Sequence, residues 1–394
     1  MTTFSSHSTP LSDFKNNNNG QMKNHKQRLN NNPAVDESNT SGVLTQMHTN
    51  NHEQVVFCHD KDTGLRAIIA IHNTVLGPSL GGTRMWSYAT EADALTDVLR
   101  LSRGMTYKAA VAGLNLGGGK AVIIGDARKD KSEALMRRFG KFVESLNGKY
   151  ITAEDVGISS KDMEYIRLET KNVTGLPVDM GGGGDPGPVT AYGVYLGIKA
   201  AAKSLWDNDS LAGKKIGVEG IGSVGYRVAE YLVKENAKVF ACDLYADRLT
   251  KINAELGVEV VETEKFYDQA MDIYAPCALG ATINDKSLER LKCSIIAGSA
   301  NNQLANEHVH SQKIIEKGIL YIPDFVINAG GLINVYTELH GYNESRALAN
   351  TEKIYQTILD ILKMAKDNDL TPNEASIRLA EERIEKIAKI KATY

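Results

Sequence analysis

The sequence predicts an α/β protein of two domains, and three observations support this. The first half mixes strand and helix patterns, with apolar strand-like runs at 54–58 and 65–72 and helical spacing of apolar residues at 91–103. Residues 181–188 are four glycines, an aspartate, and two prolines around a fifth glycine, which cannot lie inside an ordinary helix or strand. Strands and helices then alternate to about residue 335, which is typical of a doubly wound parallel sheet. Residues 181–188 therefore mark a hinge or an inter-domain loop.

The remaining patterns of the first half fill in its elements. The hairpin-like pair of strands is joined by a turn at 62–64, and Thr90 is placed to cap the first helix. The following segments predict a loop at Gly117–Gly119, a buried strand at Ala121–Ile124, an amphipathic helix at Ser132–Leu146 and a short strand at Tyr150–Ala153.

Length and composition are those of an ordinary soluble globular protein. The chain has 394 residues, of which 42% are hydrophobic and 24% are charged. A net charge of -3 gives no reason to expect a nucleic acid or an anionic membrane as partner, and no apolar run is long enough to span a bilayer. The cysteines are scattered without a C-x-x-C pair, so free thiols, a reducing compartment and no metal site are expected.

The N-terminal segment differs from the rest. Residues 1–48 are rich in Asn, Ser, Thr and His, including the run Asn16–Asn19, and contain too few apolar residues to offset the entropy of ordering. We expect a disordered tail and a cytoplasmic protein, because the segment lacks the apolar core of a signal peptide. The basic residues Lys23, Lys26 and Arg28 leave a transit peptide open as an alternative.

The clearest chemical signal follows the strand Lys215–Val218. It is a glycine fingerprint, G-x-G-x-x-G, followed by a helix to Asn236, a second strand at Lys238–Ala241, and Asp243. The first glycine permits a tight turn, the second lets the backbone approach a pyrophosphate, and the third allows close packing of helix and strand. The residues of the fingerprint are Gly220, Ile221, Gly222, Ser223, Val224 and Gly225.

This arrangement predicts a Rossmann-type domain that binds NAD. The helix N-terminus attracts the pyrophosphate, and Asp243 can bind the ribose hydroxyls while repelling the 2′-phosphate of NADP. Glu219, just before the first glycine, is unusual beside a pyrophosphate, so we expect its side chain to point away from the ligand.

Candidate catalytic groups lie in three upstream segments that contain Lys108, Lys120 and Asp155. Lys120 follows three glycines, but the flanking residues do not fit the Walker pattern, so it is not a nucleotide-phosphate lysine of that type. A lysine between a glycine turn and a buried strand can be partly desolvated, which lowers its pKa towards that of a base. An ordinary surface lysine stays open as the alternative on spacing alone.

Several segments together resemble the glutamate/leucine/phenylalanine/valine dehydrogenase family, and within it the members that oxidise leucine. The resemblance is nearly continuous from about Glu53 to the C-terminus, and the N-terminal tail lies outside it. It rests on a substrate loop at 76–86, the segments ending at Lys108 and Lys120, the segment around Asp155, and residues 273–280, 300–303 and 327–331.

The resemblance implies a role for each matching residue. Lys108 would bind the substrate α-carboxylate, Lys120 would be the general acid/base that activates water, and Asp155 would handle the amine proton. Asn302 would hold the substrate near the nicotinamide. Further residues implied in substrate binding are Leu80, Gly81, Met105, Leu332 and Val335, and those implied in cofactor binding are Thr190, Cys277, Ala278 and Asn301.

The resemblance also implies an organisation and a reaction. Residues 49–185 would form the substrate-binding and oligomerisation domain, 186–340 the NAD domain, and 341–394 would pack back on the first domain, with substrate in the cleft between. The implied assembly is a homo-oligomer, an octamer. The implied reaction is the reversible, NAD-dependent oxidative deamination of L-leucine, and also of isoleucine and valine, to the 2-oxo acid and ammonia.

The resemblance also implies which substrate side chains the pocket accepts. Members that act on glutamate have a lysine where Leu80 stands, whereas Leu80, Leu332 and Val335 would form an apolar pocket that disfavours a carboxylate. Plain core packing is the alternative for Leu80 and for Val335. Leucine and valine differ by one methylene, worth about 1–3 kcal/mol in such a pocket, so both are expected substrates.

Three other functions stay open. A valine or phenylalanine dehydrogenase of the same family would share every motif. A non-catalytic NAD-binding regulatory protein would keep the fold and lose a catalytic side chain, although Lys108, Lys120 and Asp155 are all present. An interaction protein acting through its Asn-rich tail is the third.

Overall fold

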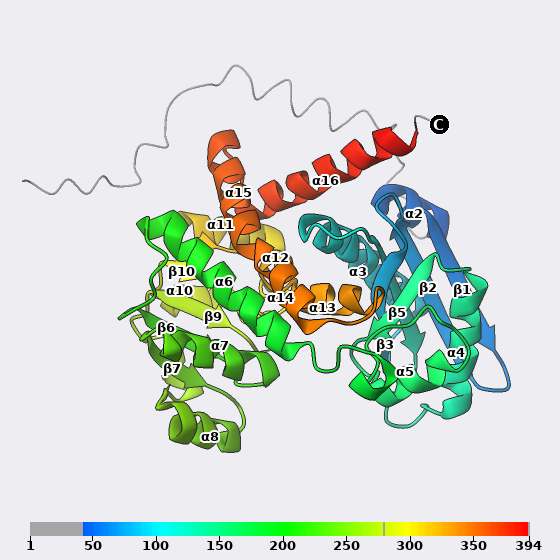
Figure 1. Ribbon diagram of the computed structural model, residues 1–394, viewed down its shortest axis with the longest axis horizontal. Helices are drawn as coiled ribbons and strands as arrows, with labels where there is room; N and C mark the ends of the chain where they lie inside the picture. The colour runs from blue at the N-terminus through cyan, green and yellow to red at the C-terminus, as the bar shows by residue number, and fades with distance from the viewer. Residues whose placement is uncertain (1–41, 279, 393–394) are drawn as a thin grey trace, which may run out of the picture. The chain divides into compact units, whose positions relative to one another are not determined.

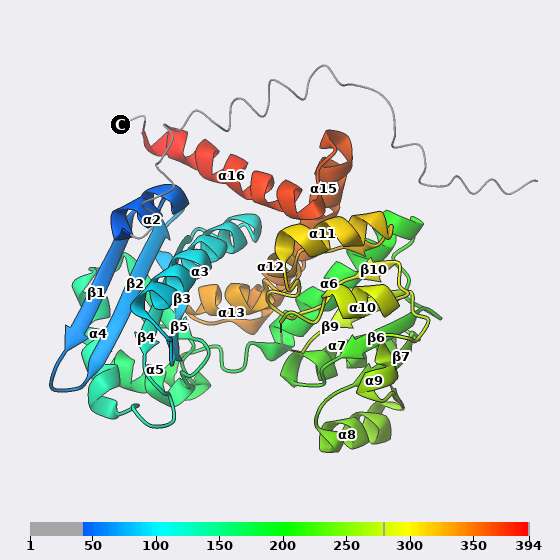
Figure 2. The same cartoon turned by 180° about the vertical axis from the view of Figure 1, so that it is seen from behind.

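A computed structural model describes residues 42–278 and 280–392. The described residues from Met47 onward form one compact unit, which contains two separate β-sheets. Figures 1 and 2 show its elements from opposite sides. This confirms the predicted α/β fold of two domains.

The first sheet has five strands in the order β1-β2-β4-β3-β5. β1 pairs antiparallel with β2 and β2 with β4, whereas β3 runs parallel to both β4 and β5. The strands are β1 (Gln54–Asp60), β2 (Leu65–Asn73), β3 (Ser79–Trp86), β4 (Gly117–Ile124) and β5 (Tyr150–Glu154).

Helices cover both faces of this sheet. Neighbouring residues of a strand point to opposite faces, and in β5 Ile151 packs in the cluster beneath α3 (Glu91–Val111), while Tyr150 packs beneath α4 (Glu133–Ser145). The side chains of Thr90 and Ser132 cap α3 and α4, so both predicted helices are confirmed, and α3 extends eight residues beyond the predicted end at Arg103. The face beneath α4 is completed by α5 (Ser160–Arg167).

The predicted loop at Gly117–Gly119 is wrong, because all three glycines belong to β4. None of them has a positive φ, so they are not there for a turn. A Cβ on Gly117 would come 1.9 Å from Asn73 O, and one on Gly118 would come 2.2 Å from Thr106 N. The glycines therefore let the neighbouring strand and α3 pack unusually close to β4. The predicted substrate loop at 76–86 is likewise mostly strand β3.

The second sheet has six strands, all parallel, in the order β11-β10-β9-β6-β7-β8. This confirms the predicted Rossmann-type topology. Its strands are β6 (Lys215–Glu219), β7 (Lys238–Cys242), β8 (Glu259–Val260), β9 (Ile273–Pro276), β10 (Ile295–Ile296) and β11 (Leu320–Tyr321). Its helices are α6 (Gly187–Trp206), α7 (Ser223–Lys234), α8 (Ala246–Leu256), α9 (Thr263–Phe266), α10 (Asp285–Arg290), α11 (Glu307–Glu316), α12 (Asp324–Ile327) and α13 (Gly330–Glu338).

An irregular segment joins the two halves, as the glycines and prolines at 181–188 predict. It follows a short 3-10 helix, η3 (Val178–Met180), and ends where α6 begins at Gly187, with Pro188 in the first turn. Glu338 of α13 fastens this connection, because its carboxylate accepts hydrogen bonds of 2.8 Å from the backbone N–H groups of Gly175 and Gly183.

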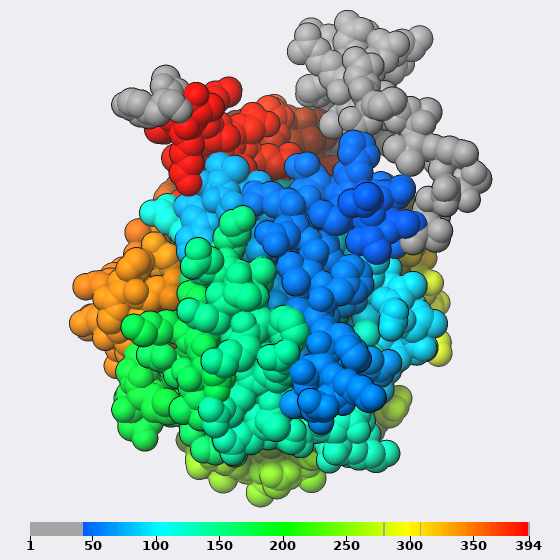
Figure 3. All heavy atoms as spheres, turned by 90° about the vertical axis from the view of Figure 1, so that its right-hand side faces the viewer, coloured from blue at the N-terminus to red at the C-terminus, as the bar shows by residue number. Residues whose placement is uncertain are grey.

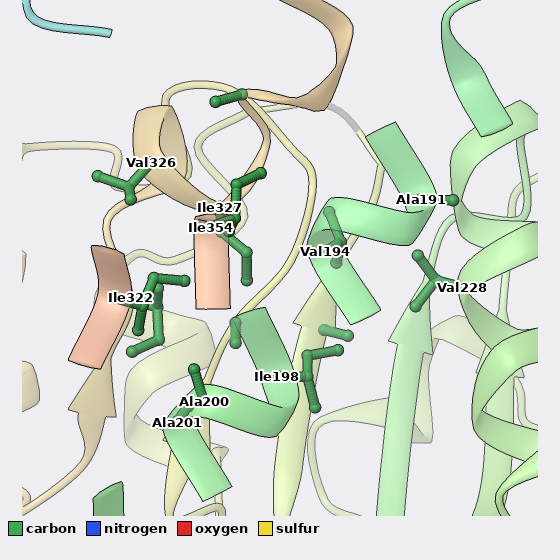
Figure 4. Close-up of a cluster of buried hydrophobic side chains, with 14 of the residues drawn as sticks. Ala191, Val194, Ile198, Ala200, Ala201, Val228, Ile322, Val326, Ile327 and Ile354 are labelled. Carbon is green, nitrogen blue, oxygen red and sulfur yellow. The ribbon is translucent and has the colours of Figure 1, made fainter. Parts of the chain in front are cut away.

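The C-terminal helices divide between the two halves, which corrects the prediction that residues 341–394 pack as a whole on the first domain. α14 (Glu344–Thr351) and α15 (Lys353–Asn368) pack on α6, whereas α16 (Pro372–Lys391) packs on α3. Gly193 and Gly197 of α6 leave space for the isoleucines of α15 in an apolar core shown in Figure 4. On α16, the Arg383 guanidinium donates to the carbonyls of Ala110 and Leu114. The predicted boundary at 340 stays a prediction.

Helix α2 (Val43–Asn50) corrects the end of the predicted tail, whose last residues are helical. The helix ends against a buried side chain, because His72 Nε2 donates to the carbonyl of Asn50. The rest of the predicted tail, residues 1–41, lies outside the described residues. Among the described residues, no helix is long and apolar enough to cross a membrane. The four cysteines are free thiols, as predicted.

Candidate active site

A buried lysine and a carboxylate form the centre of the candidate site. Lys120, in the middle of β4, is only 6% exposed, and its Nζ lies 2.9 Å from Oδ2 of Asp155, which follows β5. Strand β3 lies between β4 and β5, and its residue at this level is Gly82, where a Cβ would come 2.9 Å from Asp155 Cβ. Because Gly82 has no side chain, Lys120 can reach across β3 to Asp155.

Burial and charge set the protonation of this pair. Burial lowers the pKa of Lys120 below the ordinary lysine value, although Asp155 partly opposes this effect. Burial alone would raise the pKa of Asp155, but the positive charges of Lys120 and Arg84 outweigh it and hold that pKa below the usual aspartate value. The pair is therefore an ionised carboxylate beside an amine that gives up its proton more easily than an ordinary lysine.

Lys108 links this centre to the second sheet. It lies in the last turn of α3, and its Nζ donates a 2.6 Å hydrogen bond to Oδ1 of Asn328, at the C-terminal end of α12. The Asn328 amide in turn donates to Asn301 Oδ1 at 2.7 Å. Burial lowers the pKa of Lys108 to about 8, while Asp324 opposes this and Lys120 adds to it.

The residues predicted to contact the substrate side chain belong to, or pack against, one large apolar cluster that extends through both halves. Leu80 of β3 and Leu332 of α13 are both buried, and Met105 and Val335 pack against the same cluster. Gly81 brings β3 close to β4, because a Cβ there would come 1.8 Å from Gly119 O. The cluster contains residues of both halves.

The glycine fingerprint has the geometry that a dinucleotide needs. Gly220 has φ +92° and lies against Ala278, and a Cβ on Gly225 would come 1.9 Å from Gly220 O, so the turn and the helix pack tightly. A Cβ on Gly222 would have nothing within 4 Å, and Gly222 caps α7 without a side-chain hydrogen bond. A ligand phosphate can therefore approach the free N–H groups at the start of α7.

A cavity of about 510 Å³ opens beside this loop. Asp243 lies at the end of β7, and its Oδ2 accepts a 2.6 Å hydrogen bond from the Ile221 N–H and an ion pair of 3.5 Å from Arg248. Asp243, the glycine loop and the cavity beside it fit the adenosine and pyrophosphate end of a nicotinamide dinucleotide. The cavity is lined by Ile221, Gly222, Ser223, Tyr226, Arg227, Glu230, Arg248 and Lys251.

The other residues predicted for the cofactor are more dispersed. The Cys277 N–H donates to the Glu219 carbonyl, next to the fingerprint, whereas Val224 packs against the apolar core. Thr190 donates its hydroxyl to the Pro186 carbonyl in the first turn of α6. Asn302 is exposed, with φ +51°, beside Asn301. These four residues, with Asn301, do not line the cavity, and their predicted roles stay predictions.

Glu219 points away from the glycine loop, as expected. Its carboxylate accepts hydrogen bonds from the hydroxyls of Tyr267, at 2.8 Å, and Tyr274. Burial raises the pKa of Glu219, although the tyrosine hydroxyls oppose the rise.

Comparisons with known proteins identify the family. The family model described as "Glu/Leu/Phe/Val dehydrogenase, dimerisation domain" matches residues 52–172, and the one described as "Glutamate/Leucine/Phenylalanine/Valine dehydrogenase" matches residues 243–382. A leucine dehydrogenase of Thermoactinomyces intermedius is 53% identical over 352 residues, which are 89% of this chain and 96% of that enzyme. The chain belongs to the glutamate/leucine/phenylalanine/valine dehydrogenase family. It is therefore an amino-acid dehydrogenase, an oxidoreductase with a nicotinamide cofactor.

Relatives with other substrates are nearly as similar to this amino-acid dehydrogenase. A phenylalanine dehydrogenase of Bacillus thermotolerans is 50% identical over 338 residues, which are 84% of this chain and 88% of that enzyme. The crystal structure of L-tryptophan dehydrogenase from Nostoc punctiforme has a TM-score of 0.81 and 46% sequence identity, and covers 88% of this chain and 99% of that one.

The sequence of this dehydrogenase did not reveal several residues that touch the predicted catalytic groups. Asn328 holds Lys108, and Arg84 on β3 contacts Asp155 at 3.0 Å. Both lie in segments that resemble the family, but the resemblance assigned no role to either residue. Arg84 could have been suspected as a charged residue in a strand that is otherwise mostly buried, whereas its partner Asp97 gives no signal in the sequence because only the fold brings α3 beside β3.

Proposed function

We propose that this dehydrogenase catalyses the reversible, NAD-dependent oxidative deamination of L-leucine, and of isoleucine and valine, to the 2-oxo acid and ammonia. The observation that carries the proposal is the buried Lys120–Asp155 pair beside Lys108 and next to an apolar cluster that contains Leu80. Each of these groups matches one part of an aliphatic amino acid: its nitrogen, its carboxylate and its side chain.

Lys108 and Asn328 bind the substrate carboxylate in this proposal. The Lys108 ammonium, now hydrogen-bonded to Asn328 Oδ1, would turn to the carboxylate, and the Asn328 amide stays nearby as a neutral donor. An ion pair with a carboxylate stabilises the charged form of a lysine, so bound substrate would also raise the pKa of Lys108 again. Proton transfer is then left to Lys120.

Lys120 and Asp155 handle the protons. The nicotinamide supplies the acceptor for the hydride that leaves the substrate α-carbon. Lys120, in its neutral form, takes a proton from the water that adds to the carbon of the resulting iminium group. Asp155 accepts a proton from the substrate nitrogen before oxidation and returns it to that nitrogen as ammonia leaves. Lys120 passes the proton taken from water to solvent, then accepts the hydroxyl proton of the carbinolamine as the carbonyl forms and releases it in the same way, so both groups end in their starting state.

The apolar cluster selects the substrate side chain. Leu80 is only 2% exposed, and a glutamate side chain there would bury a carboxylate without a partner, at a cost of several kcal/mol. One methylene is worth about 1–3 kcal/mol, so valine, which is one methylene smaller, should be slower than leucine and still accepted. Isoleucine, an isomer of leucine branched at Cβ, should also be accepted. Asp243 supports NAD over NADP, because its carboxylate at the end of β7 would repel a 2′-phosphate.

The test is NADH formation at 340 nm with NAD and L-leucine, isoleucine, valine, phenylalanine, tryptophan or glutamate. Leucine should give the highest kcat/KM, and glutamate should give none. Lys120→Ala should lower kcat about 10²–10⁴-fold, the contribution expected of general acid–base catalysis. Lys129→Ala, which removes a lysine with an 80% exposed side chain, is the matched control and should be unchanged.

Two results would overturn this proposal. A higher kcat/KM for phenylalanine or tryptophan than for leucine would reassign the substrate to the aromatic amino acids. Absence of NADH with every amino acid, from folded protein that binds NAD, would favour a non-catalytic NAD-binding role.

We also propose that the chain forms a homo-oligomer through its first domain. Support comes from the matched family model, described as a dimerisation domain, and from β1, an edge strand on which Phe57 is 55% exposed. The blue residues of β1 form part of the surface in Figure 3. Size-exclusion chromatography with light scattering should give several times the 42.9 kDa of one chain, whereas a monomer at micromolar concentration would contradict the proposal. The cytoplasmic location stays a prediction.

A further inference from the structure

We propose that Arg84 is a positioning residue, which holds Asp155 by one carboxylate oxygen so that the other oxygen faces the substrate nitrogen. The inference rests on the proposed amino-acid oxidation. It assigns a role to a cluster of three residues, Arg84, Asp97 and Tyr88, which we call the clamp. The clamp contacts the Lys120–Asp155 pair through Arg84.

The contacts place Arg84 between two carboxylates. Its Nε donates to Asp155 Oδ2 at 3.0 Å, and its Nη1 donates to Asp97 Oδ2 at 2.9 Å. The Tyr88 hydroxyl donates to the same oxygen of Asp97 at 2.7 Å. Asp97 lies in α3, so the clamp joins a helix to the strand that carries Arg84.

Both cations reach the same oxygen of Asp155. Lys120 Nζ and Arg84 Nε each lie within 3.0 Å of Oδ2. None of the described residues donates a hydrogen bond to the other oxygen, Oδ1. With Oδ2 held from two sides, the carboxylate cannot rotate about its own axis without breaking both contacts. Oδ1 is thereby left in a fixed direction for a proton on the substrate.

Only an arginine can make this clamp. Its guanidinium is planar and presents separate N–H donors at fixed angles, whereas the single ammonium of a lysine cannot reach Asp155 and Asp97 in the same way. The side chains involved are all largely buried, with exposed fractions of 21% for Arg84, 23% for Asp155 and 16% for Asp97. Charges that are largely buried are screened less than exposed ones. Loss of one of these contacts should therefore change the position and the protonation of Asp155 and Lys120.

The clamp also affects Lys120. The charged groups that act on this lysine are Asp155 after β5, Arg84 on β3, and Asp97 and Lys108 on α3. Removal of the Arg84 charge would make the protonated form of Lys120 more favourable, and Asp155 would then interact with Lys120 alone. The pH at which Lys120 becomes neutral, and so able to act as a base, should therefore rise.

The experiment compares pH profiles of leucine oxidation for wild type, Arg84→Met and Arg84→Lys. Arg84→Met should lower kcat about 10²-fold, change the KM for leucine less than threefold, and move the acidic-limb midpoint of kcat, where the rate rises as Lys120 loses its proton, to higher pH. Arg84→Lys keeps the charge without the two-sided geometry, so the midpoint should stay near that of wild type while kcat still falls. Arg100→Ala, which removes a 60% exposed side chain that touches Asp97 and not Asp155, is the control and should behave as wild type.

A second readout does not depend on catalysis. The pH dependence of acetylation of Lys120 by acetic anhydride, followed by mass spectrometry of the modified peptide, reports when that amine becomes neutral. In Arg84→Met this curve should shift to higher pH by at least half a unit. If Arg84→Met fails to fold, Asp97→Asn is the second variant. It frees the outer end of the clamp, so kcat should fall, and it removes a negative charge that favours protonated Lys120, so both curves should shift to lower pH.

The outcomes separate the two proposals. A wild-type protein that oxidises no amino acid overturns the proposed function and leaves the acetylation curves to decide on Arg84. An active wild type, with kcat of Arg84→Met within twofold and both curves unmoved, shows that Arg84 only stabilises the fold and overturns the inference.

Discussion

Two glycine-rich segments, Gly117–Gly119 and Gly220–Gly225, look alike in the sequence and do opposite things in the structure. The first is the start of a strand that is buried except at its last residue, and a Cβ on each of its glycines would collide with a neighbouring backbone or side chain. The second is a turn at the N-terminus of α7, where Gly222 faces open space. The glycines of the first segment allow close packing within the protein, and those of the second leave space for a ligand.

This difference explains how each half supports its share of the chemistry. Tight packing of β4 against α3 fixes Lys120 and Lys108 relative to each other, because one lysine lies on the strand and the other on the helix. The open second segment leaves N–H groups at the start of α7 free for a phosphate. Substitutions of single glycines should therefore separate stability from cofactor binding.

The largest effect is expected for Gly118→Ala. Its Cβ would come 2.2 Å from both the backbone nitrogen and the hydroxyl oxygen of Thr106, so α3 would have to move away from β4. We expect a loss of about 3 kcal/mol in the free energy of unfolding, the upper end of the usual cost of overpacking. Urea denaturation followed by circular dichroism measures this loss.

Gly104→Ala provides the matched control for that measurement. Gly104 lies inside α3 and has nothing within 4 Å of the added methyl group, so alanine should stabilise the helix by roughly 0.5–1 kcal/mol. A loss of less than about 1 kcal/mol in Gly118→Ala would mean that β4 and α3 adjust freely, against the contrast between the two segments.

The same contrast shows how far the sequence could be interpreted. The fingerprint could be predicted because its strand, glycines, helix and acid are contiguous, and each has a local reason. The strand character of Gly117–Gly119 could not, because its cause is the approach of Asn73, Thr106 and Tyr150 from elsewhere in the chain. In the sequence of a single segment, a glycine is equally consistent with a turn and with the close approach of another part of the chain.

The candidate site follows the same rule. Lys108, Lys120 and Asp155 were found through segments that resemble a family, and the structure then brought Lys120 and Asp155 to 2.9 Å. The partners Asp97 and Asn328 were not found, since each acts across elements that are distant in the sequence. The helix α2 was missed for a similar reason, because its last carbonyl is held by His72 of the sheet.

A smaller effect is expected from pH, with opposite signs beside the two glycine segments. Near the first, burial lowers the pKa values of His52 and His72 from 6.5 to about 4. Histidine pKa values lower in the folded than in the unfolded chain give stability that is complete above pH 6.5 and is lost as the pH falls towards 4. Acidification from pH 7 to 5 should therefore remove about 2 kcal/mol for each histidine.

Near the second segment, the raised pKa of Glu219 acts the other way. A carboxyl group with a raised pKa in the folded chain stabilises it at low pH, and this contribution is lost as the pH rises above the ordinary glutamate value of 4.5. Hydrogen exchange corrected for intrinsic rates should show β4 losing protection between pH 7 and 5 while β6 does not. His72→Gln should reduce the loss in β4, and equal losses in both strands would contradict the assignment.

The smallest effect on the fold, and the most specific one on function, is expected for Gly222→Ala. Its φ of −81° suits alanine and its surroundings are open, so the free energy of unfolding should change by less than about 1 kcal/mol. The methyl group would nevertheless stand where a pyrophosphate approaches the start of α7, and the affinity for NAD should fall about tenfold, or about 1.4 kcal/mol. Isothermal titration with NAD measures this, with Gly104→Ala again as the control that keeps wild-type affinity. Unchanged NAD affinity in Gly222→Ala would place the cofactor away from this loop, and the contrast between a segment packed for the protein and one left open for a ligand would fail.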